Sequence, residues 1–166
     1  RQMCIRDSLG AQGDGVARLG GEAVFVAGAL PGEMVRVEGP GDRPRLVGVD
    51  GPSPARAAPI CSYFGVCGGC AVQHVGAPLY AEWKRELVIT ALEREGLSPP
   101  VAALADGHGA GRRRVTLHGR KRGAEAVAGF MRAKSHELVA IEACPILKPE
   151  LAAAPAIALA VTQALK

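Results

Sequence analysis

Short apolar runs separated by turn residues characterise residues 9–50. In residues 34–38 two valines alternate with charged side chains, which is the period-two pattern of a strand with one buried face. Residues 23–26 and 45–50 are further strand candidates, and Gly-Asp-Gly, Gly-Gly and Pro-Gly turn signals punctuate the segment. Many short strands at this spacing favour a small closed barrel of the oligonucleotide-binding type, the alternative being another five-stranded β module. Residues 51–60 contain three prolines without periodicity, which predicts a stiff linker.

A helical period follows in residues 78–95. Apolar side chains recur every four positions from Leu79 to Ala91, as on one face of an amphipathic helix. Pro78 suits the first turn of this helix, and Gly96 suits the position after its end. The spacing therefore predicts one helix of about five turns.

The last third of the chain returns to short strands before a final helix. In residues 112–122 an alternating stretch predicts a strand that runs into a basic turn. Residues 127–131 and 137–142 are two further strand candidates. Pro149 is expected to open a helix, which Pro155 should kink or restart.

Three cysteines fall within the ten residues CSYFGVCGGC, with the spacing C-x5-C-x2-C. They are Cys61, Cys67 and Cys70, and the remaining candidate of the same type is Cys144 in ACPIL. Four thiolates suit either tetrahedral zinc or an iron–sulfur cluster. Structural zinc sites usually present two C-x2-C pairs, whereas three clustered ligands and one remote ligand are typical of a [4Fe–4S] cluster.

The residues around these cysteines favour a cluster. Gly68 and Gly69 allow a tight turn that brings backbone N–H groups close to cluster sulfides. Pro145 follows the last cysteine, as in the C-P ending of bacterial ferredoxin runs. His74 is predicted to be a packed, hydrogen-bonded structural residue rather than a ligand. Zinc, a disulfide, a thioredoxin-like pair in CGGC and isolated buried thiols are the alternatives.

Charge is concentrated in one place. The chain of 166 residues carries a net charge of +4 with a pI near 9.0, which suggests a polyanionic partner. Arginine suits bidentate phosphate contact and base stacking, so the basic segment predicts RNA contact, the alternative being a solvated surface turn. Its six basic residues are Arg112, Arg113, Arg114, Arg120, Lys121 and Arg122.

Both ends of the chain are unusual. The first eight residues, RQMCIRDS, resemble translated sequencing-adapter read-through, so residues 1–8 are expected to be non-native and Cys4 is set aside. The chain stops inside a helical pattern, at QALK, and is therefore expected to be a piece of a longer protein. No apolar run reaches 18 residues and no signal-peptide pattern is present, so a reducing cytoplasmic compartment without a membrane partner is expected.

Several segments resemble one known family. GDGVARLGGEAVFVAGALPGEMVRV resembles a TRAM domain, a small RNA-binding β-barrel fused to RNA-modifying enzymes. CSYFGVCGGCAVQH resembles the [4Fe–4S] loop of the bacterial RNA (uracil-C5) methyltransferases that act on 23S ribosomal RNA. GRRRVTLH and GFMRAKSHELVAIEACPILKPEL resemble the central domain of the same enzymes, including its fourth cluster cysteine. The resemblance covers residues 9–166.

This resemblance implies an α+β organisation with three parts. Residues 9–56 would be the TRAM barrel, similar to an oligonucleotide-binding barrel, and residues 57–147 an α/β central RNA-binding domain carrying the iron–sulfur loop. Residues 148–166 would be a helix leading to an absent Rossmann-like domain that binds S-adenosylmethionine. The implied cluster ligands are Cys61, Cys67, Cys70 and Cys144.

In this family a cysteine thiolate attacks C6 of a flipped-out uracil, C5 takes the methyl group, and a carboxylate removes the C5 proton. The 166 residues contain no methyl-donor loop of the D-x-x-C-G-x-G kind and no downstream nucleophilic cysteine or catalytic glutamate. The expectation is therefore a monomeric RNA-recognition portion, inactive alone, with a structural cluster. A redox-sensing cluster, a tRNA-directed enzyme and a stand-alone iron–sulfur RNA-binding module are the alternatives.

Overall fold

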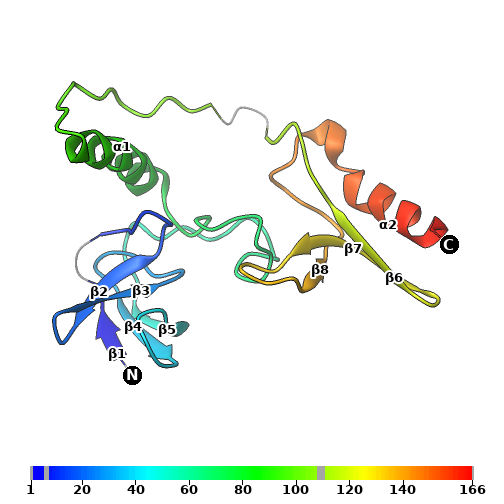
Figure 1. Cartoon of the computed structure of the whole chain (residues 1–166), viewed down its shortest axis with the longest axis horizontal. Coiled ribbons are helices and arrows are strands. Elements are labelled where there is room, and N and C mark those ends of the chain that lie inside the picture. Colours follow the sequence, from blue (N-terminus) through cyan, green and yellow to red (C-terminus); the bar gives the residue numbers. More distant parts are fainter. Residues whose placement is uncertain (1, 6–7, 108–110, 166) are drawn as a thin grey trace. The chain divides into compact units, whose positions relative to one another are not determined.

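The computed structural model describes residues 2–5, 8–107 and 111–165. The chain divides into two compact units, which are residues Arg1–Ala58 with Ala71–Ala105, and residues Pro59–Cys70 with Asp106–Lys166. We call them the first and the second unit. Figure 1 follows the elements along the chain; in order they are β1 (Gln2–Cys4), β2 (Gly15–Leu19), β3 (Glu22–Val26), β4 (Met34–Glu38), β5 (Arg45–Gly51), α1 (Ala77–Arg94), β6 (His118–Arg122), β7 (Glu125–Met131), β8 (Leu138–Ala140), the 3-10 turn η1 (Pro149–Leu151) and α2 (Ala154–Ala164).

Two antiparallel sheets make up the strand portion of the first unit. One has the order β1-β4-β5, and the other is the β2–β3 hairpin. The alternation in β4 is confirmed, because Val35 and Val37 are fully buried while the residues between and beside them are exposed. Together with Ile5 and Val26, these valines form the centre of the core.

The predicted α+β class is confirmed, but the strands do not close into a barrel. Within the described residues, pairing leaves a three-stranded and a two-stranded sheet, and register shifts interrupt β4–β5 on either side of Val35 and Arg36. The sequence pattern determines which face of a strand is buried, but it does not determine which strand edges pair. The closure expected from strand spacing therefore has no counterpart in the observed ladders.

Part of the segment that we set aside as non-native belongs to this fold. Residues 2–4 form the edge strand β1 beside β4, and Met3 and Ile5 are buried. Ile5 also exchanges backbone hydrogen bonds with Gly32 and Glu33, at 2.8 Å each. Residues 1, 6 and 7 lie outside the described residues. An apolar residue at every second position, which is a strand signal, was present in this segment.

Helix α1 confirms the predicted helix to within one residue at each end. Its first half packs on the strand portion of the first unit, where Leu79, Tyr80 and Trp83 contact a small cluster of Leu9, Leu30 and Val75. The indole N–H of Trp83 donates a hydrogen bond to the carbonyl of Gly10 at 3.1 Å. The predicted boundaries place this helix in residues 57–147, whereas the compact units place it with the strands of residues 9–51.

A buried ion pair ties the predicted linker to the first unit. The guanidinium of Arg56 donates to both carboxylate oxygens of Glu33, at 2.6 and 2.7 Å, and to the carbonyl of Gly28 at 2.7 Å. Glu33 is fully buried and also accepts from the backbone N–H groups of Leu30 and Ser53. Residues 51–60 are therefore held in place by Arg56 as well as stiffened by proline.

His74 lies in the same buried region, and its side chain is 1% exposed, which agrees with the predicted packed role. Burial and the positive charge of Arg56 together lower the pKa of His74 to about 4, although Glu33 and a backbone hydrogen bond at Ala29 act in the opposite direction. In the unfolded chain a histidine titrates near 6.5. The unfolded state therefore binds more protons than the folded state between these two pH values.

Stability of the first unit should consequently fall as the pH falls below about 6.5. The histidine contribution is about 1.4 kcal/mol of unfolding free energy for each pH unit in that window. The variant His74→Gln should lack this slope, whereas His118→Gln, at an exposed position, should keep it. Urea unfolding between about pH 7 and about pH 5 measures the slope while Glu33, an acid with a lowered pKa, stays ionised. Equal slopes in wild type and His74→Gln would contradict the assignment.

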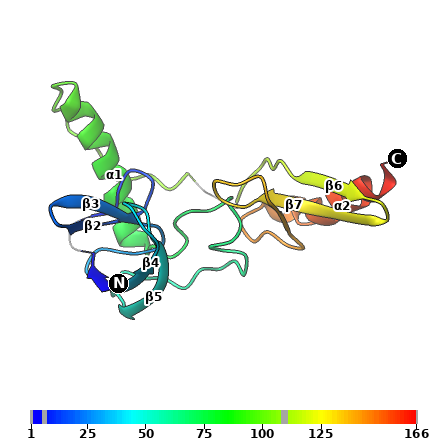
Figure 2. The same cartoon turned by 60° about the horizontal axis from the view of Figure 1, so that its bottom comes forward.

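The second unit is built on the antiparallel sheet β6-β7-β8, with α2 against one face of the hairpin β6–β7 (Figure 2). Gly119 allows this approach, because a Cβ there would lie 2.1 Å from the hydroxyl of the buried Thr162. The predicted strand of residues 112–122 forms only from His118 onwards. The final helix confirms the prediction, since a 3-10 turn begins at Pro149 and α2 begins anew with Pro155 in its first turn.

None of the described helices combines the length and the apolar character that are needed to span a bilayer.

Candidate metal centre and nucleic-acid interface

The loop of residues 61–70 is held by backbone hydrogen bonds. Within it, the N–H of Cys67 donates to the carbonyl of Tyr63 at 2.9 Å. At its end, the N–H of Gly68 donates to the carbonyl of Met131 at 2.9 Å, and Cys67 forms an isolated bridge with Arg132. The loop therefore docks on the end of β7.

Gly68 is required by this docking. A Cβ at Gly68 would lie 2.8 Å from both the carbonyl oxygen of Met131 and the backbone nitrogen of Ala133, which are backbone atoms that cannot yield. The next residue, Gly69, turns its N–H toward the sulfur of Cys67, with a distance of 3.3 Å. This amide-to-sulfur contact is of the kind that tunes and orients thiolate ligands.

The segment that carries Cys144 is fastened to the same region by Arg112. The backbone of Arg112 pairs with this segment, donating to the carbonyl of Ile146 at 2.8 Å and accepting from Lys148 at 3.1 Å. Its guanidinium donates to the carbonyl of Gly69 at 3.0 Å. Arg112 thus links the two parts of the chain that bear cysteines.

A second link joins the same two parts. The hydroxyl oxygen of Tyr63, inside the loop, accepts a hydrogen bond from the backbone N–H of Glu142, two residues before Cys144, at 3.2 Å. This contact could not be predicted, because nothing in the spacing of residues relates Tyr63 to Glu142.

The pKa of the Cys144 thiol depends on its surroundings. Burial raises the pKa of Cys144, and the nearby thiols of Cys70 and Cys61 raise it further, while a backbone hydrogen bond at Ile146 and the charge of Arg112 oppose the rise. Like-charge effects of this kind act over limited range, so the thiols of Cys70 and Cys61 each lie within electrostatic range of Cys144. All of the cysteines are free thiols of intermediate exposure.

The cysteine thiols do not converge on a common point among the described residues. Among the described residues, no three cysteine, histidine or acidic side chains converge closely enough to hold a metal ion. A zinc ion holds each thiolate sulfur at about 2.3 Å. Thiolates around a cluster of four irons stand farther apart, because each binds a different iron. The four cysteines stay candidate ligands.

The six basic residues that we predicted to contact RNA do not form one surface. Arg112 belongs to the scaffold just described, while Arg113 and Arg114 are exposed in an irregular segment. Lys121 donates to the carbonyl of Gln163 at 2.7 Å and to that of Leu165, at the carboxyl end of α2, where a cation is stabilised by the helix dipole. The two that remain are Arg120 and Arg122.

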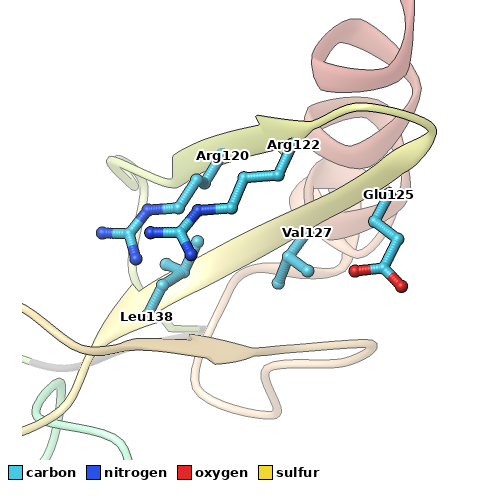
Figure 3. Close-up of a pocket in the computed structure, with 5 residues that line it drawn as sticks. All are labelled: Arg120, Arg122, Glu125, Val127 and Leu138. Carbon is cyan, nitrogen blue, oxygen red and sulfur yellow. The ribbon is translucent and has the colours of Figure 1, made fainter.

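Arg120 and Arg122 lie on the face of β6 opposite α2, where they border an open hollow of about 130 Å³ (Figure 3). The floor and far side of the hollow come from Val127, Leu138 and Glu125, on the neighbouring strands. Sequence reasoning missed these three residues. Nothing in the sequence marked them, because residues 125–131 show no alternation of polar and apolar side chains and Leu138 belongs to another strand.

Relatives of the chain were found among curated bacterial proteins. No protein-family model matches the chain. An uncharacterised RNA methyltransferase of Caulobacter vibrioides is 47% identical over 156 residues, which is 92% of this chain and 38% of that protein. A protein of Photorhabdus laumondii named 23S rRNA (uracil(1939)-C(5))-methyltransferase RlmD is 42% identical over 154 residues, which is 87% of this chain and 35% of that protein. A second uncharacterised RNA methyltransferase, from Agrobacterium fabrum, is 41% identical over 148 residues, or 86% and 36%. The chain spans little more than a third of the length of these relatives.

Proposed function

Because the chain is a homologue of bacterial RNA methyltransferases over most of its length, we propose that it forms the RNA-recognition portion of an S-adenosylmethionine-dependent 23S rRNA (uracil-C5) methyltransferase. The observation that carries this proposal is 47% identity over 156 residues to one such relative, with 42% identity to a protein named for this reaction. The concentration of arginine in residues 112–122 supports an RNA partner.

A [4Fe–4S] cluster is the second part of the proposal. Its ligands would be Cys61, Cys67, Cys70 and Cys144. The influence of Cys70 and Cys61 on the thiol of Cys144 and the amide contact to the sulfur of Cys67 support the assignment. When bound, the cluster would supply iron–thiolate bonds that cross-link the loop to the segment around Cys144. Arg112 and Tyr63 already hold these two parts together, so the role proposed for the cluster is structural.

Methyl transfer itself is proposed to lie in residues outside this chain. The described residues would bind and orient RNA while another domain acts on the base. Extruding a base from folded RNA costs a few kcal/mol, which phosphate and base contacts made by arginines would offset. The thiols of such a cluster need a reducing compartment, so we place the protein in the cytoplasm.

A chimeric enzyme tests the proposal. In the Photorhabdus relative, which is named for this reaction, the matching residues would be replaced by this chain, and methylation of 23S rRNA transcripts would be followed with a labelled methyl donor. We expect the chimera to place the methyl group on C5 of uracil. We expect the isolated 166-residue chain to bind the transcript without methyl transfer. The Photorhabdus protein lacking those residues is the control, and it should lose most of its activity.

Two results would overturn the proposal. Methyl transfer by the isolated chain would show that the catalytic residues lie within it. A chimera no more active than the deletion control, although folded, would show that these residues do not serve the same recognition.

A further inference from the structure

The outer face of the β6–β7–β8 sheet, opposite α2, is open in the second unit. In the hairpin, Arg120 pairs with Val127 and Arg122 pairs with Glu125. Since side chains alternate between the two faces of a strand, these four point away from the face that Gly119 turns toward α2. The face thus presents two arginines on one strand opposite an apolar and an acidic residue on the next.

The two arginines are placed as an anion clamp. Their guanidinium groups extend together toward Leu138, while the carboxylate of Glu125 lies apart from both (Figure 3). Among the residues that the structure describes, no ion pair neutralises Arg122, and Arg120 makes only a long contact, at 3.4 Å, to the carbonyl of His136. Two adjacent positive charges repel one another unless an anion lies between them. A phosphate group fits this role, because guanidinium forks bind phosphate oxygens in pairs.

The floor of the hollow is apolar. Val127 is 37% exposed, and Leu138 is partly exposed beside it. An apolar floor next to an anion clamp suits a nucleotide, which carries a flat base or a sugar next to its phosphate. A volume of about 130 Å³ is below the roughly 300–1,000 Å³ of ligand pockets, so the hollow receives part of one such unit and not a helix. In duplex RNA the bases are stacked away from such a floor, whereas an unpaired nucleotide exposes them.

We propose that this hollow binds one unpaired nucleotide of the RNA substrate. Arg120 and Arg122 hold its phosphate, and Val127 with Leu138 contacts its base or sugar. Glu125 repels a second phosphate and accepts a hydrogen bond from a donor on the nucleotide, which sets the direction of the strand. The proposal rests on the proposed function, and it adds a defined nucleotide site to it.

Binding of a short, fluorescein-labelled single-stranded RNA of mixed sequence to the 166-residue chain tests the site. The double variant Arg120→Gln/Arg122→Gln should weaken binding about tenfold or more. It should also reduce the slope of log affinity against log salt concentration by about 0.7, which is one neutralised phosphate on a single strand. The control is Arg85→Gln/Arg94→Gln on α1, which removes the same charge from exposed positions of the first unit and should change both quantities little.

Two competitors separate a nucleotide site from a plain anion site. Inorganic polyphosphate and duplex RNA of the same sequence should displace the labelled strand from wild type less effectively than the unlabelled strand does. Equal competition by either would overturn the nucleotide assignment, as would equal affinities of the two double variants. These failures leave the proposed function standing, because wild type still binds RNA. If wild type binds no RNA, the proposed function itself fails.

Discussion

Replacing Glu33 with alanine is expected to lower the free energy of unfolding of the first unit by about 3–5 kcal/mol. The carboxylate is fully buried and holds Arg56 through two short hydrogen bonds. It also satisfies the N–H groups of Leu30 and Ser53. Removing it leaves a positive charge and two backbone donors without their partner in the interior, and the cost of burying unpaired groups of this kind is large.

The chain offers a matched control for this change. Glu38 pairs with Arg45 at 2.7 Å, as Glu33 pairs with Arg56, but both members of that second pair are exposed. Glu38→Ala should therefore cost less than about 1 kcal/mol. Urea unfolding followed by the fluorescence of Trp83, the only tryptophan, measures both variants within the first unit. Similar losses for Glu33→Ala and Glu38→Ala would show that burial of the ion pair contributes nothing.

The pKa of Glu33 is consistent with this role. Burial alone would raise it, but the hydrogen bonds from Arg56, Leu30 and Ser53 and the charge of Arg56 outweigh burial, so the pKa is lowered. A carboxylate with a lowered pKa stabilises the folded state above its unfolded pKa, and this contribution disappears as the pH falls. Acid should therefore weaken the first unit twice, first through His74 and then through Glu33.

Local patterns were sufficient for the individual elements. Alternating valines placed β4 correctly, the four-residue apolar spacing placed α1 within one residue, and Pro155 marked the start of α2. In each case the determining interaction lies within a few residues along the chain. The residues Ile5 and Glu33, in contrast, depend on contacts across the first unit, and the buried ion pair joins residues 23 positions apart.

The basic residues of 112–122 show why charge alone did not predict which side chains are available to bind RNA. Six similar side chains in residues 112–122 receive four different environments in the second unit, of which one is the exposed irregular segment of Arg113 and Arg114. Arg112 fastens the loop, Lys121 meets the end of α2, and Arg120 lines an open hollow. Strand parity separates the last two, since neighbouring residues of β6 face opposite sides of the sheet. The face on which each residue of β6 lies could be assigned only once the start of the strand was known, because residues 113–117 do not join it.

Both local sequence patterns and contacts between distant residues bear on the candidate metal centre. Spacing and counting selected Cys61, Cys67, Cys70 and Cys144, and the tertiary structure places the first and third of these thiols within electrostatic range of the fourth. Nothing in the sequence indicated that Arg112 and Tyr63 would connect the loop to the distant segment. The identity of the bound group therefore stays a prediction.

Replacing Cys144 with alanine is expected to remove the cluster almost completely. Without Cys144 one iron of the cluster would lack its thiolate ligand, so iron and acid-labile sulfide should fall from about four per chain toward zero. The broad visible absorption of anaerobically purified protein should disappear with them. The loop of residues 61–70 should then be cleaved several-fold faster in limited proteolysis, because only the contacts of Arg112, Tyr63 and Gly68 still hold it.

Cys4 provides the control, because it is also a free thiol of intermediate exposure but belongs to the first unit. Cys4→Ala should keep the full iron and sulfide content and the proteolysis rate of wild type. Unchanged iron in Cys144→Ala would mean that this cysteine is not the fourth ligand. A colourless wild-type protein with one zinc per chain would replace the cluster by a single-ion site, and the thiols would then have to move closer together than they lie here, since zinc binds each sulfur at about 2.3 Å.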